Sequence, residues 1–298
     1  MSLRERVFHI KYLMLAPTVL ILLFITVYPF LRAIFMSFHT WNLAAAAQDP
    51  EFVGFKNFAT ALTTPRFWGS AGKTFELLLF AVGTQLLAGI GIAVLIDNVF
   101  RRGSKIVQGM VLVPMMLAPV VVGLLWKMLY NAQFGVLPYL LSLVGFPEHM
   151  DFTGNPALSL FSIILADIWQ WTPFVVLVML AGLKSVPDHL LESAQIDGAN
   201  GLQQFLFVKL PLLKSSLLVV ILIRTMDAFK LFDKVYMLTL GGPGSSTETL
   251  SYYLYLQGFK NYKMGYSSAI TLLMLLFVLA FSFILIDVMR KGRTQGDR

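Results

Sequence analysis

The sequence predicts an all-α integral membrane protein with six transmembrane helices. Hydrophobic residues occupy 57% of the 298 positions and charged residues only 13%, whereas about a quarter of the residues in a soluble domain are charged. Apolar runs recur along the chain, and each is long enough to cross about 30 Å of hydrocarbon as a helix of about 20 residues. Basic residues gather at alternate connections between these runs, which is typical of multi-pass membrane proteins.

Six apolar segments are predicted to span the membrane. Their expected limits are 12–35, 73–96, 106–130, 158–180, 217–240 and 266–289. The first is too long for the core of a signal peptide, and no small-residue cleavage site follows it, so we expect it to be retained. The expected organisation is a short segment 1–11, a six-helix membrane domain 12–289 and a tail 290–298.

The basic residues predict which side of the membrane each loop faces. An even number of spans places both termini on one side, and the loops expected on that side carry Arg4, Arg6, Lys11, Arg101, Arg102, Lys105, Lys184, Lys209, Lys214, Arg290, Lys291, Arg293 and Arg298. The opposite loops carry fewer, and the stretch 131–156 carries none. By the positive-inside rule, both termini and the central loop 184–214 are expected to be cytoplasmic.

Composition excludes several classes of site. The chain has no cysteine, so it can form neither a disulfide nor a thiolate metal site. It contains no HExxH motif and no GxxxxGK[ST] phosphate-binding loop. We therefore expect this chain to bind no metal or cofactor. The net charge of +7 is explained by the basic flanks of the spans and requires no nucleic acid.

The central loop 184–214 is predicted to form two short amphipathic helices at the membrane surface. Pro187 suits the first turn of a helix, and Ser185 just ahead is a candidate cap. Gly198 is expected to end the first helix, and Pro211 to end a second helix over 202–210. Such a bent pair presents an apolar ridge, which suits either a protein partner or the lipid headgroups.

Charged residues recur inside the fifth predicted span. The stripe consists of Arg224, Asp227, Lys230 and Lys234, with Asp233 next to it in sequence. A charge at the bilayer centre costs about 2.5–3.5 kcal/mol, so these groups must face protein or water. Two compatible interpretations stay open. Asp227 neutralises Arg224 and Lys230 in a structural network, or the stripe lines a translocation path and hydrogen-bonds a hydroxylated substrate.

An aromatic cluster lies well inside the fourth predicted span. It consists of Trp169, Gln170, Trp171 and Phe174. Aromatic faces stack on the C–H surfaces of sugars and an amide can bridge hydroxyls, so the cluster suits a carbohydrate. The alternative is an interfacial aromatic belt, but a belt lies nearer the ends of a span. Pro173 is expected to break the helix and free carbonyl groups towards a cavity.

Three motifs together resemble the permeases of binding-protein-dependent ABC importers, in particular those of the carbohydrate type. Glu192-Ser193-Ala194, Asp197-Gly198-Ala199 and Leu210-Pro211 are similar to the family's EAA coupling loop, with Ser193 in place of an alanine. The stretch 238–250 resembles the LTxGGPxxxTxTL segment of one of the two permease types. The stretch 52–58, FVGFKNF, resembles a shorter F-x-G-x-x-N-F pattern.

The resemblance implies a type I ABC importer permease fold with a cytoplasmic coupling helix. It implies a heterodimeric membrane domain with a homologous second permease, and a cytoplasmic ATPase dimer that holds ATP and Mg. This chain would therefore not be an enzyme. An extracytoplasmic substrate-binding protein would deliver the substrate, and the chain would lie among the lipids of a bacterial inner membrane without nucleic acid. The family's sugar-contacting positions match Trp171, Phe174, Arg224, Asp227, Ala228 and Leu231.

The function expected from these observations is import of a sugar, oligosaccharide or polyol. A sugar phosphate or an acidic sugar stays open as the substrate, because Arg224 and Lys230 could meet an anion. An intramembrane enzyme is disfavoured, since no histidine lies inside a span and the few embedded acids are expected each to have a basic neighbour. A proton-coupled secondary transporter with Asp227 as the relay would leave the coupling loop unexplained.

Overall fold

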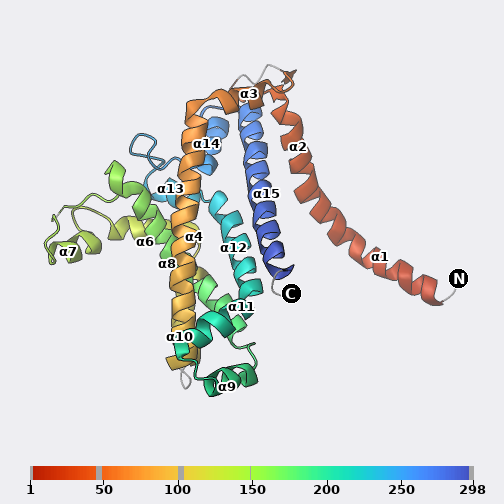
Figure 1. Ribbon diagram of the computed structural model, residues 1–298. Coiled ribbons are helices and arrows are strands. Elements are labelled where there is room, and N and C mark those ends of the chain that lie inside the picture. The colour runs from red at the N-terminus through yellow and green to blue at the C-terminus, as the bar shows by residue number, and fades with distance from the viewer. Residues whose placement is uncertain (1–2, 45–48, 100–103, 148, 295–298) are drawn as a thin grey trace. The chain divides into compact units, whose positions relative to one another are not determined.

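The computed structural model describes residues 3–44, 49–99, 104–147 and 149–294 (Figure 1). The predicted all-α class is confirmed: in these ranges the strands are two residues long, β1 (His39–Thr40) paired antiparallel with β2 (Glu51–Phe52). Four described helices are long and apolar enough to cross a membrane, and two bent helix pairs raise the number to six if each pair is one span. Of the predicted cytoplasmic basic residues, Arg101, Arg102 and Arg298 lie outside the described ranges.

The chain forms two compact units, one made of 1–65 with 254–276 and the other of 66–253 with 277–298. The first unit contains the first predicted span as α1 (Leu3–Leu22), a π-helical turn η1 (Leu23–Val27) and α2 (Tyr28–Ser37). The turn ends two residues before Pro29, whose missing N–H interrupts the regular hydrogen-bond ladder. The most apolar stretch of this span contains no buried residue, so the side chains of that stretch lie on the surface of the unit.

The FVGFKNF segment builds a compact turn in the first unit. Gly54 adopts φ +54°, a conformation that favours glycine. Asn57, near the start of α3 (Lys56–Thr63), donates its side-chain amide to the carbonyls of Ser37 (2.8 Å) and His39 (3.0 Å). The asparagine therefore holds the chain where it leaves α2, which gives this motif a structural role.

Two long helices form the frame of the second unit. They are α4 (Pro65–Val99) and α8 (Pro156–Leu183). A Cβ atom at Gly89 would stand 2.5 Å from Cβ of Val175, so glycine at this position lets the two helices approach closely. The predicted break at Pro173 is wrong, because α8 continues through it without interruption.

The third predicted span is broken rather than continuous. It consists of α5 (Ser104–Leu112), a 3-10 turn η2 (Val113–Met116) and α6 (Pro119–Leu129), and the two helical parts meet at 93°. The break falls at Leu117 and Ala118, between two prolines, because proline restricts the residue before it to extended conformations. A short helix, α7 (Val136–Ser142), follows.

The fifth predicted span also ends earlier than expected. The helix α12 (Lys214–Phe229) stops at Lys230, and a separate helix, α13 (Asp233–Leu238), follows. The chain before α12 runs as α10 (Gly201–Gln203), a π-helical stretch η3 (Gln204–Lys209) and α11 (Leu210–Leu212). Pro211 lies in the first turn of α11 and does not end the helix; the 67° bend towards α12 comes at Leu213. The last elements are α14 (Leu250–Tyr255), η4 (Leu256–Lys260) and α15 (Met264–Thr294).

Candidate functional site

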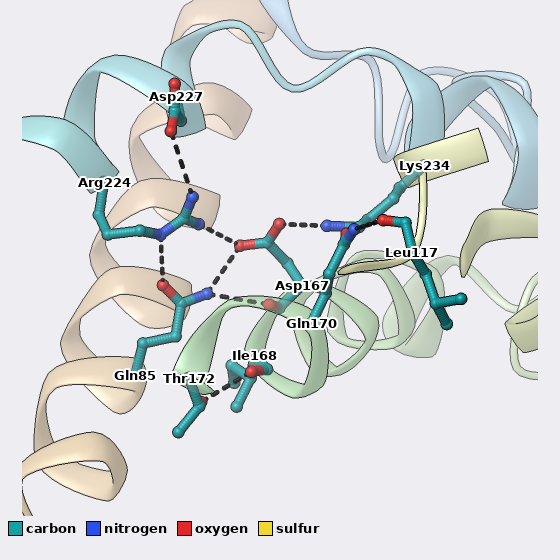
Figure 2. A network of polar contacts seen from close by, with 9 residues as sticks. All are labelled: Gln85, Leu117, Asp167, Ile168, Gln170, Thr172, Arg224, Asp227 and Lys234. Carbon is teal, nitrogen blue, oxygen red and sulfur yellow. Dashed lines mark hydrogen bonds and ion pairs between the residues drawn. The ribbon is translucent and has the colours of Figure 1, made fainter. Parts of the chain in front are cut away.

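Asp167 is the centre of a polar network inside the second unit (Figure 2). Its side chain, in the middle of α8, is fully buried. It accepts hydrogen bonds from Lys234 Nζ (2.5 Å), Arg224 Nη2 (2.8 Å) and Gln85 Nε2 (2.8 Å). Because a buried carboxylate is costly unless it is paired and hydrogen-bonded, these three donors are what allow it to lie at this depth.

Gln85 joins Asp167 and Arg224 to α4. Its Nε2 also donates to the backbone carbonyl of Asp167 (3.1 Å), while its Oε1 accepts from Arg224 Nε (2.9 Å). The network therefore connects α4, α8, α12 and α13 at one level. The Arg224 guanidinium also lies over the Trp171 ring, with its carbon 4.7 Å from the ring centroid, and this contact adds cation–π attraction.

The structure divides the fifth-span stripe into a buried part and an accessible part. Arg224 and Lys234 are each 1% exposed and both pair with Asp167. Asp227 and Lys230 are 39% and 63% exposed and pair loosely at 3.8 Å. Asp227 stands 3.9 Å from Arg224, so the main partner of Arg224 is Asp167 rather than the residue expected from helical spacing.

A cavity of about 200 Å³ lies against this network. Its lining consists of Pro119, Asp167, Trp171, Arg224, Asp227, Lys230, Leu231, Phe232, Asp233 and Lys234. The lining holds three acidic and three basic side chains, so its formal charges cancel. The cavity thus combines an aromatic wall with many hydrogen-bonding groups and no net charge. No group of three or more metal-ligating side chains occurs among the described residues.

Four of the predicted substrate-binding residues line this cavity: Trp171, Arg224, Asp227 and Leu231. The other four lie elsewhere. Phe174 packs against the apolar cluster between α4, α8 and α12. Ala228 is buried in a second apolar cluster. Trp169 is 39% exposed and meets Trp126 edge to face.

Gln170, the remaining predicted contact, supports the break in the third span. Its side chain is fully buried, and its Nε2 donates to the carbonyl of Leu117 (2.9 Å). Leu117 lies in the extended link between η2 and α6, where the backbone has lost its helical partners. Gln170 therefore replaces a missing backbone bond, as a polar side chain does where a membrane helix is broken.

Sequence reasoning missed Asp167 and Gln85. Each is a strongly polar residue within an apolar run, and that alone was a signal that it has a buried partner. The partner's identity was not readable, because Asp167 and Gln85 are 82 residues apart and the network forms only when the helices pack. Two further cavity residues lie at helix breaks that the sequence did not predict: Pro119 begins α6, and Phe232 lies between α12 and α13.

The loop that contains Gly241, Gly242 and Pro243 supports a residue that lines the cavity. Its Glu248, 2% exposed, accepts hydrogen bonds from Arg66 Nε (2.8 Å), Arg66 Nη2 (2.6 Å) and Ser70 Oγ (3.0 Å) of α4. The neighbouring Thr249 donates to the carbonyl of Leu231 (3.2 Å), a residue that lines the cavity. The loop thus links the N-terminal part of α4 to the segment between α12 and α13.

The first of the two helices predicted in the central loop is present as α9 (Asp188–Ile196). Its N-cap is Pro187, two residues after the expected cap Ser185, whose hydroxyl instead donates to the carbonyl of Gly182 (2.7 Å). Gly198 follows the helix with φ +80°, so the predicted glycine bend is in place. The next helix starts at Gly201 behind a capping box of Asn200 and Gln203.

The residues predicted to contact an ATPase lie on an open surface. No residue of α9 is buried. The exposed positions are Glu192, Ser193, Asp197 and Gly198, and the half-buried positions are Ala194 and Ala199. Docking of an ATPase on these residues remains a prediction.

Comparison with known proteins connects this architecture to membrane transport. Residues 85–292 match the family described as binding-protein-dependent transport system inner membrane component. A probable ABC transporter permease of Sinorhizobium fredii is 37% identical over 93% of this chain and 88% of that protein. The trehalose/maltose transport system permease of Thermococcus litoralis is 33% identical over 99% of this chain and 98% of that protein. A crystal structure of a bacterial ABC transporter involved in alginate import shares the fold, with a TM-score of 0.82, 24% identity and 95% coverage of both chains.

Proposed function

Because this chain belongs to the family of inner membrane components of binding-protein-dependent transport systems, we propose that it is the permease subunit of an ATP-driven sugar importer. The helices provide the membrane passage, and the cavity beside Asp167 provides the substrate contacts. The sequence contains no phosphate-binding loop, so the ATP would be hydrolysed by a separate cytoplasmic ATPase that docks at α9. Transport would proceed by alternating access around a site deep in the membrane.

The balance of charges in the cavity indicates an uncharged substrate. A neutral sugar, oligosaccharide or polyol needs many hydrogen-bonding partners and an aromatic face but no net charge, and the lining has this composition. Two accessible acids, Asp227 and Asp233, stand there against one accessible base, Lys230. Because the lining has no net charge, it would offer an anion no net attraction, which favours a neutral substrate over an acidic sugar or a sugar phosphate. The Thermococcus relative is named for trehalose and maltose, which are uncharged.

The size of the cavity supports a shared site. About 200 Å³ is below the range of about 300–1,000 Å³ that is usual for small-molecule pockets. We propose that a second, homologous permease faces this cavity and completes it. A substrate-binding protein would load the site from outside, as the periplasmic protein in the alginate transporter complex suggests by analogy. Both termini and α9 would then lie in the cytoplasm, on the side where the basic residues gather.

Uptake by the assembled complex tests this proposal. Trp171→Ala removes the aromatic wall and Asp227→Ala removes an accessible acceptor, so each should lower the rate of sugar uptake per complex by about tenfold or more, equivalent to ~1.4 kcal/mol. Phe161→Ala is the matched control, because Phe161 lies on the same helix as Trp171, is 53% exposed and does not line the cavity. Unchanged uptake by both cavity variants would place the substrate site elsewhere.

A further inference from the structure

The helix α4 makes polar contacts with other segments at three levels. Near one end, Asp97 accepts a hydrogen bond from Lys209 Nζ (3.1 Å); in the middle, Gln85 bonds to Arg224; near the other end, Ser70 bonds to Glu248. At 1.5 Å per residue, the first two levels are about 18 Å apart and the last two about 22 Å apart. Figure 1 shows α4 as one unbroken helix along this length.

The Asp97–Lys209 pair connects α4 to the coupling segment. Lys209 is the last residue of η3, against which α9 packs. The Lys209 and Asp97 side chains are only 11% and 23% exposed, so solvent screens their attraction less than it screens a surface pair. Within the described part of the chain, no other side-chain hydrogen bond of residues 188–213 reaches beyond that stretch.

The coupling helix itself does not pack tightly on α4 or α8. A cleft of about 510 Å³ lies between α9 and the ends of those two helices, lined by Asp97, Asp188, Leu191 and Lys209 among others. The apolar cluster near η3, which includes Ile96 and Leu213, is held by non-directional contacts that allow sliding. An ion pair with defined geometry fixes η3 at one position along α4.

We propose that Asp97 and Lys209 are positioning residues that make α4 move with the coupling segment when the ATPase changes conformation. The displacement then reaches the cavity through Gln85, which bonds both Arg224 and Asp167. This inference rests on the proposed function, because it assigns a path for force that an ATPase applies at α9. An unbroken helix suits the task, since it transmits movement along its axis without internal rearrangement.

Charge exchange in the intact complex tests the pair. The chain has no cysteine, so Leu231→Cys introduces a single thiol in this chain, and that thiol lines the cavity. The complex is reconstituted into vesicles with ATP enclosed, and a membrane-impermeant maleimide is added outside. In the parent, which carries Leu231→Cys alone, labelling of this chain should increase with enclosed ATP. When Asp97→Lys or Lys209→Asp is added to this parent, labelling should no longer depend on ATP. When both exchanges are added, labelling should depend on ATP again.

The controls separate transmission from assembly. Glu76→Lys reverses a charge on the same helix in an ion pair that stays within α4, Lys73–Glu76 at 2.8 Å, and should keep the ATP response. Each variant should retain as much ATPase as the parent. An ATP response that persists in both single variants, or that the double exchange does not restore, overturns the proposed pair. A parent complex that shows no ATP response overturns the proposed function itself.

Discussion

Replacing Asp167 by asparagine should destabilise the protein more than any other single change in the network. The carboxylate accepts from both Arg224 and Lys234, each 1% exposed, and an amide cannot balance either charge. Breaking a buried ion pair by removing one partner costs about 3–5 kcal/mol, because an uncompensated charge stays behind. At roughly 2 °C per kcal/mol for a domain of this size, the unfolding midpoint should fall by about 6–10 °C.

The assay is thermal unfolding of the purified complex in mild detergent. Asp227→Asn is the matched control, because it makes the same chemical change near the same arginine on a side chain that is 39% exposed. Exposed pairs contribute about 0–1 kcal/mol, so this variant should shift the midpoint by about 2 °C or less. Equal shifts for the two variants would refute the division of the stripe into a buried and an accessible part.

A compensated variant separates the loss of pairing from the loss of one side chain. Asp167→Leu, Arg224→Met and Lys234→Met together replace the buried charges by apolar groups of similar size. Such replacements are often neutral or stabilising, so the triple variant should recover most of the midpoint lost in Asp167→Asn. A triple variant no more stable than Asp167→Asn would show that the cost does not come from unpaired charge.

Three further predictions test other parts of the molecule. Gly198→Asp should reduce ATPase co-purification and uptake but not membrane insertion, because a Cβ there meets open space and the change alters only the bend and the docking surface; normal uptake with a bound ATPase would contradict the coupling role. Glu248→Gln should weaken the contacts of Glu248 with Arg66 and Ser70 by about 1–3 kcal/mol and speed hydrogen exchange in 239–249. Unchanged exchange would show that these contacts do not hold the loop. Asn57→Ala should lose two hydrogen bonds at about 0.5–1.5 kcal/mol each and speed exchange in 37–40, whereas an unaltered rate there would remove the structural role of this asparagine.

The elements that were predictable from sequence are those set by local physics. Hydrophobic length gives the spans, since each stretch of about 20 apolar residues buries its own backbone bonds in a helix. The bend at Gly198 was predictable because glycine adopts positive φ values more easily than other residues, and Gly198 has φ +80°. These two signals are carried by single stretches of chain and need no knowledge of neighbours.

The breaks were less predictable because proline has no single effect on a membrane helix. Pro119 begins a new helix at a 93° bend, whereas Pro173 lies inside an unbroken one. At the break, the carbonyl of Leu117 accepts a hydrogen bond from the Gln170 amide of α8, a partner far away in the sequence. Hydropathy alone cannot distinguish these outcomes.

The candidate cavity was half predictable for a related reason. Trp171 and Asp227 were identified from their chemistry and from the resemblance to known permeases, and both line the cavity. Asp167 belongs to a site that forms only when four helices meet, so helical spacing within one span assigned Asp227 to Arg224 as its partner. The stripe therefore has a buried structural part, Arg224 and Lys234, and an accessible part, Asp227 and Lys230, whose contact with a substrate stays a prediction.

The most direct test of the central claim is purification of the native complex through a tag on this chain, followed by measurement of ATP hydrolysis in the eluate. The account predicts that a homologous permease and a nucleotide-binding subunit co-purify, and that adding the matching binding protein with its sugar raises the rate of hydrolysis. Recovery of this chain alone, monodisperse and without ATPase activity, would contradict the claim that a separate ATPase drives it through α9.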